Sequence, residues 1–146
     1  MKPRIGISLG DVTGIGPEVT LKAITPLADL AAFTLIGDAG TIQRLGKQLH
    51  LDMPAGVRIH DPRPQPLPAA LPPGAAPAAQ AAVEWIREGA RLCLARELDA
   101  LVTAPVNKHA IVQAGIPFTG HTELLAEMAG NPRVVMMLLG PDHQDR

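Results

Sequence analysis

A glycine-rich stretch near the start of the chain has the composition of a turn that could hold an anion. Residues 10–18 read GDVTGIGPE and follow residues 4–9, whose apolar pattern is typical of a short buried strand. Backbone N–H groups in a strand-to-helix turn can bind a phosphate or carboxylate. The glycine spacing matches neither the dinucleotide fingerprint nor the phosphate-binding loop that ends in Gly-Lys-Ser/Thr. Two interpretations remain open: an anion site, or a tight connection in which Asp11 caps the helix.

Two further segments carry side chains that can bind ligands or move protons. Residues 103–108 (TAPVNK) follow a predicted strand at its carboxyl end, where α/β folds place ligands, and Lys108 could meet a phosphate there. Residues 119–123 (TGHTE) open a predicted helix, so His121 and Thr122 could both present polar groups to a small ligand. His121 could also act as acid or base. The alternatives are an exposed Lys108, a surface His121 and a threonine that caps the helix.

The other histidines and the single cysteine give no metal motif. No spacing such as HxxxH relates the remaining histidines, which are His50, His60, His109 and His143. The sequence therefore predicts no metal site within this chain. Because Cys93 is the only cysteine, a disulfide framework and a cysteine-based zinc ribbon are excluded. Its place on a predicted helix, near the apolar stripe, predicts a buried and inert thiol.

Composition narrows the class of protein. The 146 residues include 13 Lys and Arg against 14 Asp and Glu, a net charge of −1 that lacks the basic excess of nucleic-acid-binding proteins. No apolar run has the length of a signal peptide or of a membrane span. We therefore expect a cytoplasmic domain with neither nucleic acid nor membrane as partner. With only 2% aromatic residues, the core must be built from aliphatic side chains.

The elements that position these segments alternate between strand and helix. Apolar runs predict strands over 4–9, 32–36, 100–103 and 133–139, and helical spacing predicts helices over 17–24, 41–49, 78–98, 108–113 and 121–129. This alternation predicts a layered α/β fold with a largely parallel sheet buried on both faces. Residues 54–78 are rich in Pro and Ala and are expected to form a long loop.

The last predicted strand, residues 133–139, is followed by only residues 140–146. A βαβ fold continues with a turn or helix and a return strand, so we expect the chain to be truncated. An uncovered apolar strand is expected to favour dimerisation or aggregation.

Taken together, the three polar segments resemble the 4-hydroxythreonine-4-phosphate dehydrogenase family. Residues 10–18 are similar to its opening motif GDPAGIGPE, with Val-Thr in place of Pro-Ala at positions 12 and 13. Residues 102–108 (VTAPVNK) resemble its (V/T)(G/A)P(I/V)NK segment, and residues 115–123 (GIPFTGHTE) its most distinctive stretch. The resemblance spans essentially residues 4–140, which correspond to the first half, or slightly less, of a typical member.

This resemblance implies a fold and an activity. The family has a two-domain α/β fold related to the isocitrate and isopropylmalate dehydrogenases, and its members are homodimers; residues 1–146 would form the N-terminal part. Its members oxidise 4-phosphooxy-L-threonine with NAD or NADP and release carbon dioxide, giving 3-amino-2-oxopropyl phosphate for pyridoxal 5′-phosphate biosynthesis. A paralogue acting on threonate or erythronate 4-phosphate is one alternative. A non-catalytic truncated fragment is another.

The resemblance also assigns roles to residues. His121 and Thr122 match the positions that bind the small phosphorylated four-carbon substrate, with His121 as the residue that could assist proton movement. Asp11 and Lys108 would support the site. A divalent metal (zinc, magnesium or cobalt) is expected for the full-length family, but its histidine ligands lie beyond the point that corresponds to residue 146. The chain alone is therefore expected to lack metal ligands and to be inactive.

Overall fold

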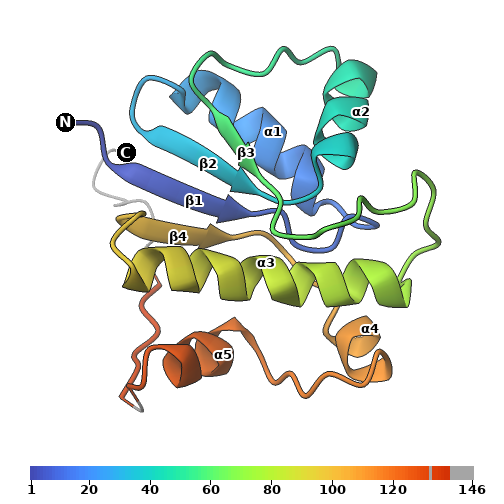
Figure 1. The fold of residues 1–146 in the computed structure, drawn as a ribbon, viewed down its shortest axis with the longest axis vertical. Coiled ribbons are helices and arrows are strands. Elements are labelled where there is room, and N and C mark those ends of the chain that lie inside the picture. The colour runs from blue at the N-terminus through green and yellow to red at the C-terminus, as the bar shows by residue number, and fades with distance from the viewer. Residues whose placement is uncertain (132, 139–146) are drawn as a thin grey trace, which may run out of the picture.

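Four short parallel strands form the central sheet of the computed structural model, which describes residues 1–131 and 133–138. They are β1 (Arg4–Ser8), β2 (Ala32–Ile36), β3 (Arg58–His60) and β4 (Ala100–Thr103), in the spatial order β3-β2-β1-β4 (Figure 1). Ile7 of β1 lies opposite Leu35 of β2 on one side and Val102 of β4 on the other. The strand order therefore reverses beside β1, and α/β sheets bind ligands at the carboxyl end of such a reversal.

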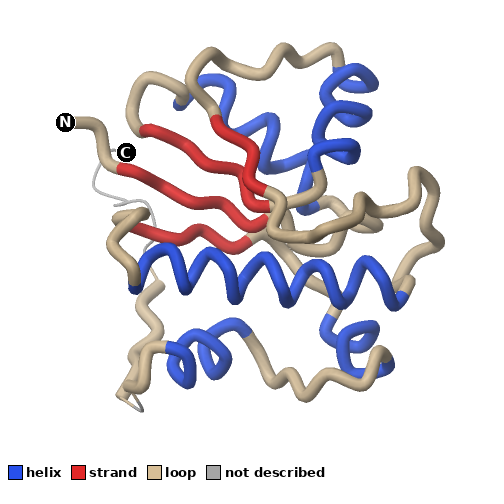
Figure 2. Tube along the Cα trace, in the orientation of Figure 1, coloured by secondary structure: helices blue, strands red, loops and turns tan. Residues whose placement is uncertain are grey.

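Helices cover both faces of this sheet (Figures 1 and 2). On one face lie α1 (Gly16–Leu27) and α2 (Ala39–Leu49), and α3 (Ala76–Leu94) crosses the other. Two short helices, α4 (Lys108–Gln113) and α5 (His121–Met128), pack against the side of α3 that faces away from the sheet. The structure confirms the predicted layered α/β class with its parallel sheet.

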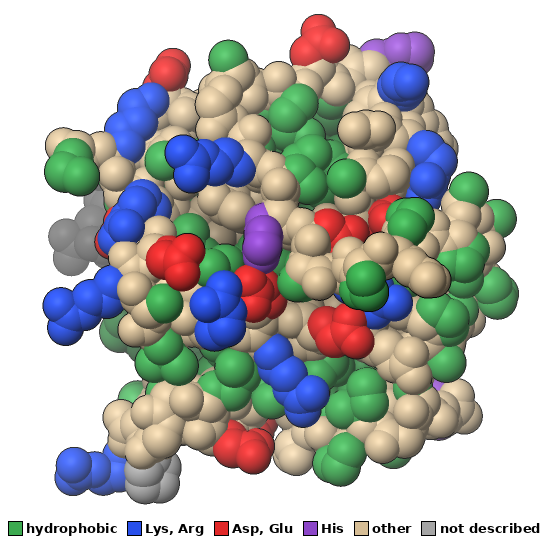
Figure 3. Space-filling model, viewed as in Figure 1, with side chains coloured by type: hydrophobic (Ala, Val, Ile, Leu, Met, Phe, Trp, Pro, Cys, Tyr) green, Lys and Arg blue, Asp and Glu red, His purple; other side chains and the backbone are tan. Residues whose placement is uncertain are grey.

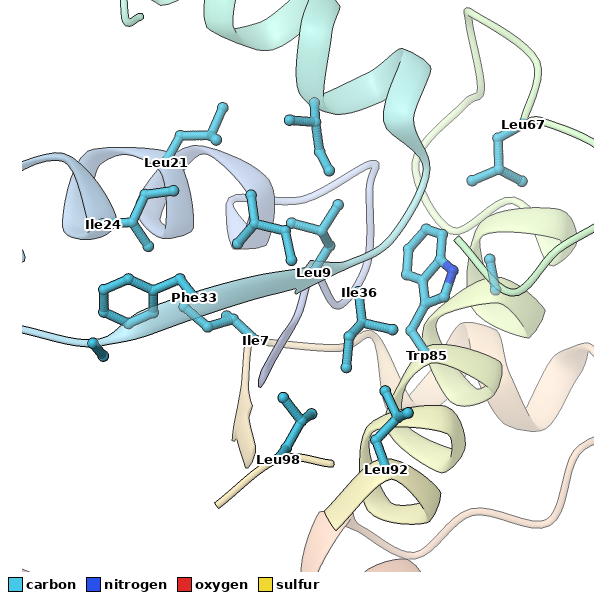
Figure 4. Packing of buried hydrophobic residues seen from close by; sticks show 14 residues of the cluster. Ile7, Leu9, Leu21, Ile24, Phe33, Ile36, Leu67, Trp85, Leu92 and Leu98 are labelled. Carbon is cyan, nitrogen blue, oxygen red and sulfur yellow. The ribbon is translucent and has the colours of Figure 1, made fainter. Parts of the chain in front are cut away.

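The larger hydrophobic cluster fills the space between the sheet and its flanking helices (Figure 4). Alternate side chains of β2 serve opposite faces: Phe33 packs on the α1 side with Ile24, and Ile36 points toward Trp85 of α3. Because Trp85 is the only fully buried aromatic residue in the described chain, aliphatic side chains supply most of this core, as the composition predicts.

Two glycines allow α3 to lie close to the sheet. A Cβ atom added to Gly89 of α3 would lie 2.5 Å from the Leu101 side chain, and one added to Gly6 of β1 would lie 2.5 Å from the Leu98 side chain. Distances this short force a shift in a packed interior. The missing side chain at Gly89 therefore lets α3 approach β4, and the one at Gly6 leaves room for Leu98 in the segment that joins α3 to β4.

A second, smaller cluster attaches α4 and α5 to the outer side of α3. Val83 and Ile86 of α3 meet Ile111 of α4 and Leu124 of α5, and all four side chains are buried. This packing fixes where α4 and α5 begin, and those two helix starts carry the polar residues singled out from the sequence.

The proline-rich segment 54–78 contains a strand that the sequence did not predict. Residues Arg58–His60 form β3, which pairs in parallel with β2 at the edge of the sheet. A three-residue edge strand leaves too short an apolar pattern to be recognised, and its existence depends on the neighbour with which it pairs.

Three side-chain contacts anchor that segment to the rest of the domain. Two of its anchors are side-chain contacts with glutamates of α3, across whose face acidic and basic side chains alternate (Figure 3). The anchors join His60 to Glu88 (2.7 Å), Arg63 to Glu84 (2.6 Å) and the Leu67 N–H to the Asp38 carboxylate (3.1 Å).

Two helix ends differ from those expected. The first helix continues through Pro26 to Leu27, because a proline in the last turn removes few backbone hydrogen bonds. The long helix ends at Leu94 rather than at residue 98, since Arg96 adopts the left-handed conformation (φ 58°) that terminates helices. Leu94, the last residue of the helix, is exposed.

The strand predicted over 133–139 is the clearest error. Residues 133–138 form neither strand nor helix, and their side chains are exposed, with Val135 at 93% and Leu138 at 89%. Residue 139 lies outside the described residues. An apolar run becomes a strand only when a neighbour supplies hydrogen bonds, and no described strand pairs with this segment.

Candidate functional site

The glycine-rich turn after β1 is shaped by close contacts within the chain itself. Gly10 has φ +68°, and a Cβ atom there would collide with the carbonyl oxygen of Pro105. A Cβ atom at Gly16 would lie 2.5 Å from the carbonyl oxygen of Leu9. Both glycines are therefore required by the packing of the β1–α1 turn against the segment after β4. Of the two interpretations of this turn, the structure favours a tight connection.

Asp11 organises this turn but does not cap α1. Its buried Oδ1 accepts hydrogen bonds from the Thr13 N–H (2.8 Å) and from the Thr13 hydroxyl (2.7 Å). The N-cap of α1 is Ile15, with no side-chain hydrogen bond, so the proposed capping role of Asp11 is wrong. The Thr13 hydroxyl also accepts from the Gly74 N–H (3.2 Å), which ties the proline-rich segment to the turn.

A small pocket of about 260 Å³ opens between this turn and the segment after β4. It lies at the carboxyl ends of β1 and β4, where the strand order reverses. Its polar lining comes mainly from Asp11, Thr13 and Asn107. The position agrees with the general rule for α/β folds, whereas Lys108, His121 and Thr122 are not among its lining residues.

The connection from β4 to α4 places Lys108 at a helix start. The Asn107 side chain caps α4 by accepting from the Ala110 N–H (3.1 Å). Lys108, the first residue of α4, is exposed, and its ammonium nitrogen lies 3.6 Å from the position that a Cβ atom of Gly120 would occupy. The Lys108 side chain therefore extends toward the start of α5.

Helix α5 begins without a side-chain cap. Gly120 is its N-cap, and neither Thr119 nor Thr122 caps the helix, so the alternative that a threonine does so is wrong. The Glu123 carboxylate folds back toward Gly120, within 2.7 Å of where a Cβ atom would lie. The first turn of α5 therefore begins close to both the Lys108 ammonium group and the Glu123 carboxylate.

His121 is held in a partly buried environment. Its ring packs against that of Phe118 in a T-shaped arrangement, with 5.9 Å between ring centres and an interplanar angle of 82°. Its Nε2 atom is buried and has no hydrogen-bond partner among the described residues. Burial and the nearby charge of Lys108 both lower the pKa of His121, so the imidazole is uncharged at neutral pH. An uncharged imidazole can donate a hydrogen bond from one nitrogen and accept one at the other.

The structure brings together three of the four residues proposed from the sequence. Lys108, His121 and Thr122 gather at the adjoining starts of α4 and α5. Asp11 lies in the separate pocket at the β1–α1 turn. Chemically, the three residues offer a positive charge, an uncharged imidazole and a hydroxyl, and the Glu123 carboxylate lies at the same helix start. Such a set can exchange hydrogen bonds with a ligand that carries both charged and hydroxyl groups.

Neither metal ligation nor thiol chemistry is apparent in the described part of the chain. No three His, Cys, Asp or Glu side chains within residues 1–131 and 133–138 lie close enough to hold a metal ion. Cys93 is half-buried, and burial together with the charge of Asp99 raises the pKa of its thiol. A thiol that stays protonated at neutral pH is a poor nucleophile.

A larger cleft of about 530 Å³ lies on the other side of the glycine-rich turn. Its walls are the turn, α2 and residues 68–72, and it contains the guanidinium group of Arg44, which donates to the Thr41 hydroxyl (3.1 Å). Sequence reasoning missed this cleft because its walls come from three separate segments. Only the helical spacing of Thr41 and Arg44 could have hinted that their side chains share a face.

A parallel sheet with a strand-order reversal defines an open α/β protein, the class of fold in which ligands generally bind at the carboxyl ends of the strands beside such a reversal. More specifically, the chain belongs to the family described as pyridoxal phosphate biosynthetic protein PdxA, whose family model matches residues 31–143. The curated relatives given below are dehydrogenases, so the family is one of oxidoreductases.

Relatives of known name resemble nearly the whole chain. A 4-hydroxythreonine-4-phosphate dehydrogenase from Geobacter metallireducens is 36% identical, over 95% of this chain and 46% of its own length. A D-threonate 4-phosphate dehydrogenase from Cupriavidus necator is also 36% identical, with the same coverage. Among solved structures, a 4-hydroxythreonine-4-phosphate dehydrogenase from Burkholderia phymatum superposes with a TM-score of 0.84 at 32% identity, covering 97% of this chain and 48% of that one.

The chain spans just under half the length of the relatives it matches. The activities of those relatives therefore belong to proteins about twice as long as this chain. Within the described residues, no helix combines the length and apolar character needed to cross a membrane.

Proposed function

We propose that this chain is the N-terminal part of an NAD(P)-dependent dehydrogenase that acts on a phosphorylated four-carbon hydroxy acid. The preferred substrate is 4-phosphooxy-L-threonine, oxidised and decarboxylated to 3-amino-2-oxopropyl phosphate in pyridoxal 5′-phosphate biosynthesis. The observation that carries the proposal is the family match over residues 31–143, which includes Lys108, His121 and Thr122. We further propose that the protein works as a cytoplasmic homodimer, on the strength of the family resemblance.

Within this proposal, the chain's own residues bind and orient the substrate. The pKa of His121 is lowered by burial and by the charge of Lys108, so its imidazole is suited to exchange hydrogen bonds with a substrate hydroxyl and to accept its proton. Thr122 adds a hydroxyl at the same helix start. Lys108 supplies the positive charge that a phosphate or carboxylate requires. Asp11 supports the site through the turn it organises.

The described residues do not form a complete binding site for the metal or for the nicotinamide cofactor that the family implies. No cluster of three potential metal ligands is present there. The glycines at positions 10 and 16 are required by backbone contacts within the chain, which argues against their use as a dinucleotide cradle.

A second candidate substrate is D-threonate 4-phosphate. It is favoured by the Cupriavidus necator relative, which matches this chain at the same identity as the Geobacter metallireducens protein. The two molecules differ in the group at the second carbon, an amine in one and a hydroxyl in the other. A third possibility, a non-catalytic fragment, makes a different prediction in the experiment below.

Substrate binding tests the proposal directly. The purified 146-residue chain is titrated with each phosphorylated acid while the ring signals of His121 are followed by NMR. L-threonine, which lacks the phosphate, is the control ligand, and His121→Asn assigns the signals. We expect the preferred acid to shift the His121 signals at concentrations at which L-threonine does not.

Formation of NAD(P)H with a divalent metal, before and after addition of a chelator, is measured on the same samples. Chelator-sensitive turnover would show that this chain is catalytic, and binding without turnover would support its role as the substrate-binding part. Failure of a folded chain to bind either acid would contradict the proposal and favour the non-catalytic fragment.

A further inference from the structure

The strand β4 lies at an open edge of the sheet (Figure 1). In the described part of the chain it pairs with β1 on one side and with no strand on the other. The Asp99 N–H, at the start of β4, bonds to the Arg4 carbonyl oxygen of β1 (2.8 Å). Since the backbone groups of successive residues point to opposite sides of a strand, the N–H groups of Ala100 and Val102 point toward the open edge. Such groups can pair with a further strand.

The face of β4 on the α1 side is also uncovered. Val102 lies opposite Ile7 of β1 in the strand register, so the two side chains share one face of the sheet. Ile7 is 7% exposed, because it belongs to the cluster that includes Leu21 and Ile24 of α1. Val102 is 51% exposed. Helix α1 therefore covers β1 and leaves β4 bare on this face.

Helix α1 presents an apolar flank toward the bare face. Leu21 and Thr25 border a cavity together with residues of α2 and with Ile59 of β3, so that flank of α1 faces away from β4. Positions two residues away lie on the opposite flank, because a helix has 3.6 residues per turn. That opposite flank carries three exposed apolar residues at intervals of four, Val19, Ala23 and Leu27.

The two edges of the sheet differ in how well they resist pairing. The edge strand β3 has only three residues, and two of them are Arg58 and His60, whose polar side chains discourage another strand. The four residues of β4 include neither a charged side chain nor proline. The charges at its start, Arg4 and Asp99, neutralise each other in an ion pair (2.6 Å). The edge at β4 is therefore the one suited to pairing.

We propose that this open side, formed by the β4 edge, Val102 and the apolar flank of α1, is an interface between two copies of the chain. A two-fold axis perpendicular to the sheet sets the two β4 strands antiparallel, so that one sheet continues into the other. The same rotation brings the two α1 flanks together over the Val102 side chains. Because each copy supplies both a strand edge and an apolar flank, the surface is complementary to itself. A net charge of −1 per copy opposes association only weakly.

The inference rests on exposure and strand register, and it does not depend on the proposed function. Residues 104–108 follow β4 directly and include Asn107 and Lys108, so the interface adjoins the candidate site along the chain. Residues 133–138 also expose apolar side chains, but they belong to no strand of the sheet. The experiment therefore has to separate their contribution from that of β4.

Association of the full 146-residue chain is measured by analytical ultracentrifugation. Each substitution is made in the unmodified chain and also in Val135→Lys with Leu138→Lys, which removes the apolar character of residues 133–138. Val102→Lys places a charge in the proposed interface. Val112→Lys on α4 is the matched control, because Val112 is similarly exposed (56%) and lies outside the interface. We expect dimers whose dissociation constant rises about tenfold or more in Val102→Lys and stays unchanged in Val112→Lys.

Hydrogen exchange of the backbone amides, followed by NMR on the same samples, locates the contact. We expect exchange at Ala100 and Val102 to slow as the dimer fills with rising concentration, because their N–H groups then bond across the two-fold axis. If Val102→Lys does not fold, Leu27→Lys on the α1 flank takes its place and should weaken the dimer in the same way.

A chain that stays monomeric at all concentrations would overturn the proposal. Dimers that Val102→Lys leaves intact, or that Val112→Lys weakens equally, would overturn it as well, and so would dimers without slower exchange at Ala100 and Val102. Because no substrate is present, each of these failures leaves the proposed dehydrogenase function standing, and failure of substrate binding leaves this result unaffected.

Discussion

Asp38 is a buried carboxylate that holds three parts of the fold together, and its removal is the sharpest test of the structure. Its side chain is only 1% exposed. Oδ1 accepts from the Thr41 N–H (2.6 Å) and the Thr41 hydroxyl (2.7 Å), which caps α2. Oδ2 accepts from the Leu67 N–H (3.1 Å), which anchors the proline-rich segment. Replacing it by alanine removes a helix cap and leaves a buried N–H without a partner.

The cost of Asp38→Ala follows from these contacts. Loss of the cap costs about 1 kcal/mol, and the unpaired Leu67 N–H costs about 1–3 kcal/mol more. We therefore expect the free energy of unfolding at pH 7 to fall by about 2–4 kcal/mol, a large part of the total for a domain of this size. Asp29→Ala is the matched control, because Asp29 is fully exposed and its one ion pair, with Lys2, is long (3.4 Å); its cost should stay below about 0.5 kcal/mol.

The same substitution makes a prediction about pH. Burial alone would raise the pKa of Asp38, but the hydrogen bonds from Thr41 and Leu67 and the charge of Arg44 outweigh it and hold the pKa below its ordinary value. The stabilisation by this carboxylate is therefore fully present above the ordinary aspartate pKa and is lost as pH falls through the lower native value. Urea unfolding at a series of pH values should show the gap between the unmodified chain and Asp38→Ala narrowing in acid. A variant as stable as Asp29→Ala at pH 7, or a gap independent of pH, would refute this reasoning.

Three other predictions concern separate parts of the chain. Gly10→Ala should lower the free energy of unfolding, measured in urea, by about 1–3 kcal/mol more than Gly56→Ala does. Both glycines have positive φ, but only Gly10 lies against the Pro105 carbonyl group. Equal losses of stability in the two variants would contradict this close contact. Hydrogen bonds from Arg91 and His60 lower the pKa of Glu88 to about 2, so an NMR titration of the Glu88 carboxyl group should have its midpoint near that value. In Arg91→Ala the midpoint should be higher. The stability that the Glu88 carboxylate contributes to the fold should be lost as pH falls through about 2. The exposed apolar side chains of residues 133–138 should promote self-association in analytical ultracentrifugation, and Val135→Lys with Leu138→Lys should reduce it; a concentration-independent monomer before substitution would count against this.

The sequence predicts best those elements whose signal is local and repeated. The strands at residues 32–36 and 100–103 and the helix at 108–113 lie where the apolar patterns place them. Each has its own period of apolar residues and a polar or glycine boundary, so neighbouring residues suffice to recognise it. The parallel class follows as well, because parallel strands need a long crossover connection and the predicted helices supply one between successive strands.

Elements that depend on distant partners are predicted poorly. The strand β3 has only three residues and exists because β2 pairs with it, whereas residues 133–138 have a strong apolar pattern and no described strand beside them. In both cases the deciding factor is a hydrogen-bonding neighbour, which no local pattern reveals. The proposed cap by Asp11 failed for a related reason: its carboxylate bonds within a turn whose path depends on Pro105.

In the candidate site, too, the residue types could be predicted from the local sequence, whereas their arrangement in space could not. His121, Thr122 and Lys108 are recognisable as residue types at helix starts, but their convergence follows from the packing of α4 and α5 on α3. One side of α3 approaches the sheet closely at Gly89, and its other side carries Val83 and Ile86, which hold the two short helices. A side chain at residue 89 would push α3 away from Leu101 and would carry both helix starts with it. The spacing of Lys108 and His121 is therefore set by the core of the domain, and a change buried beneath α3 should alter the His121 environment without contact with it.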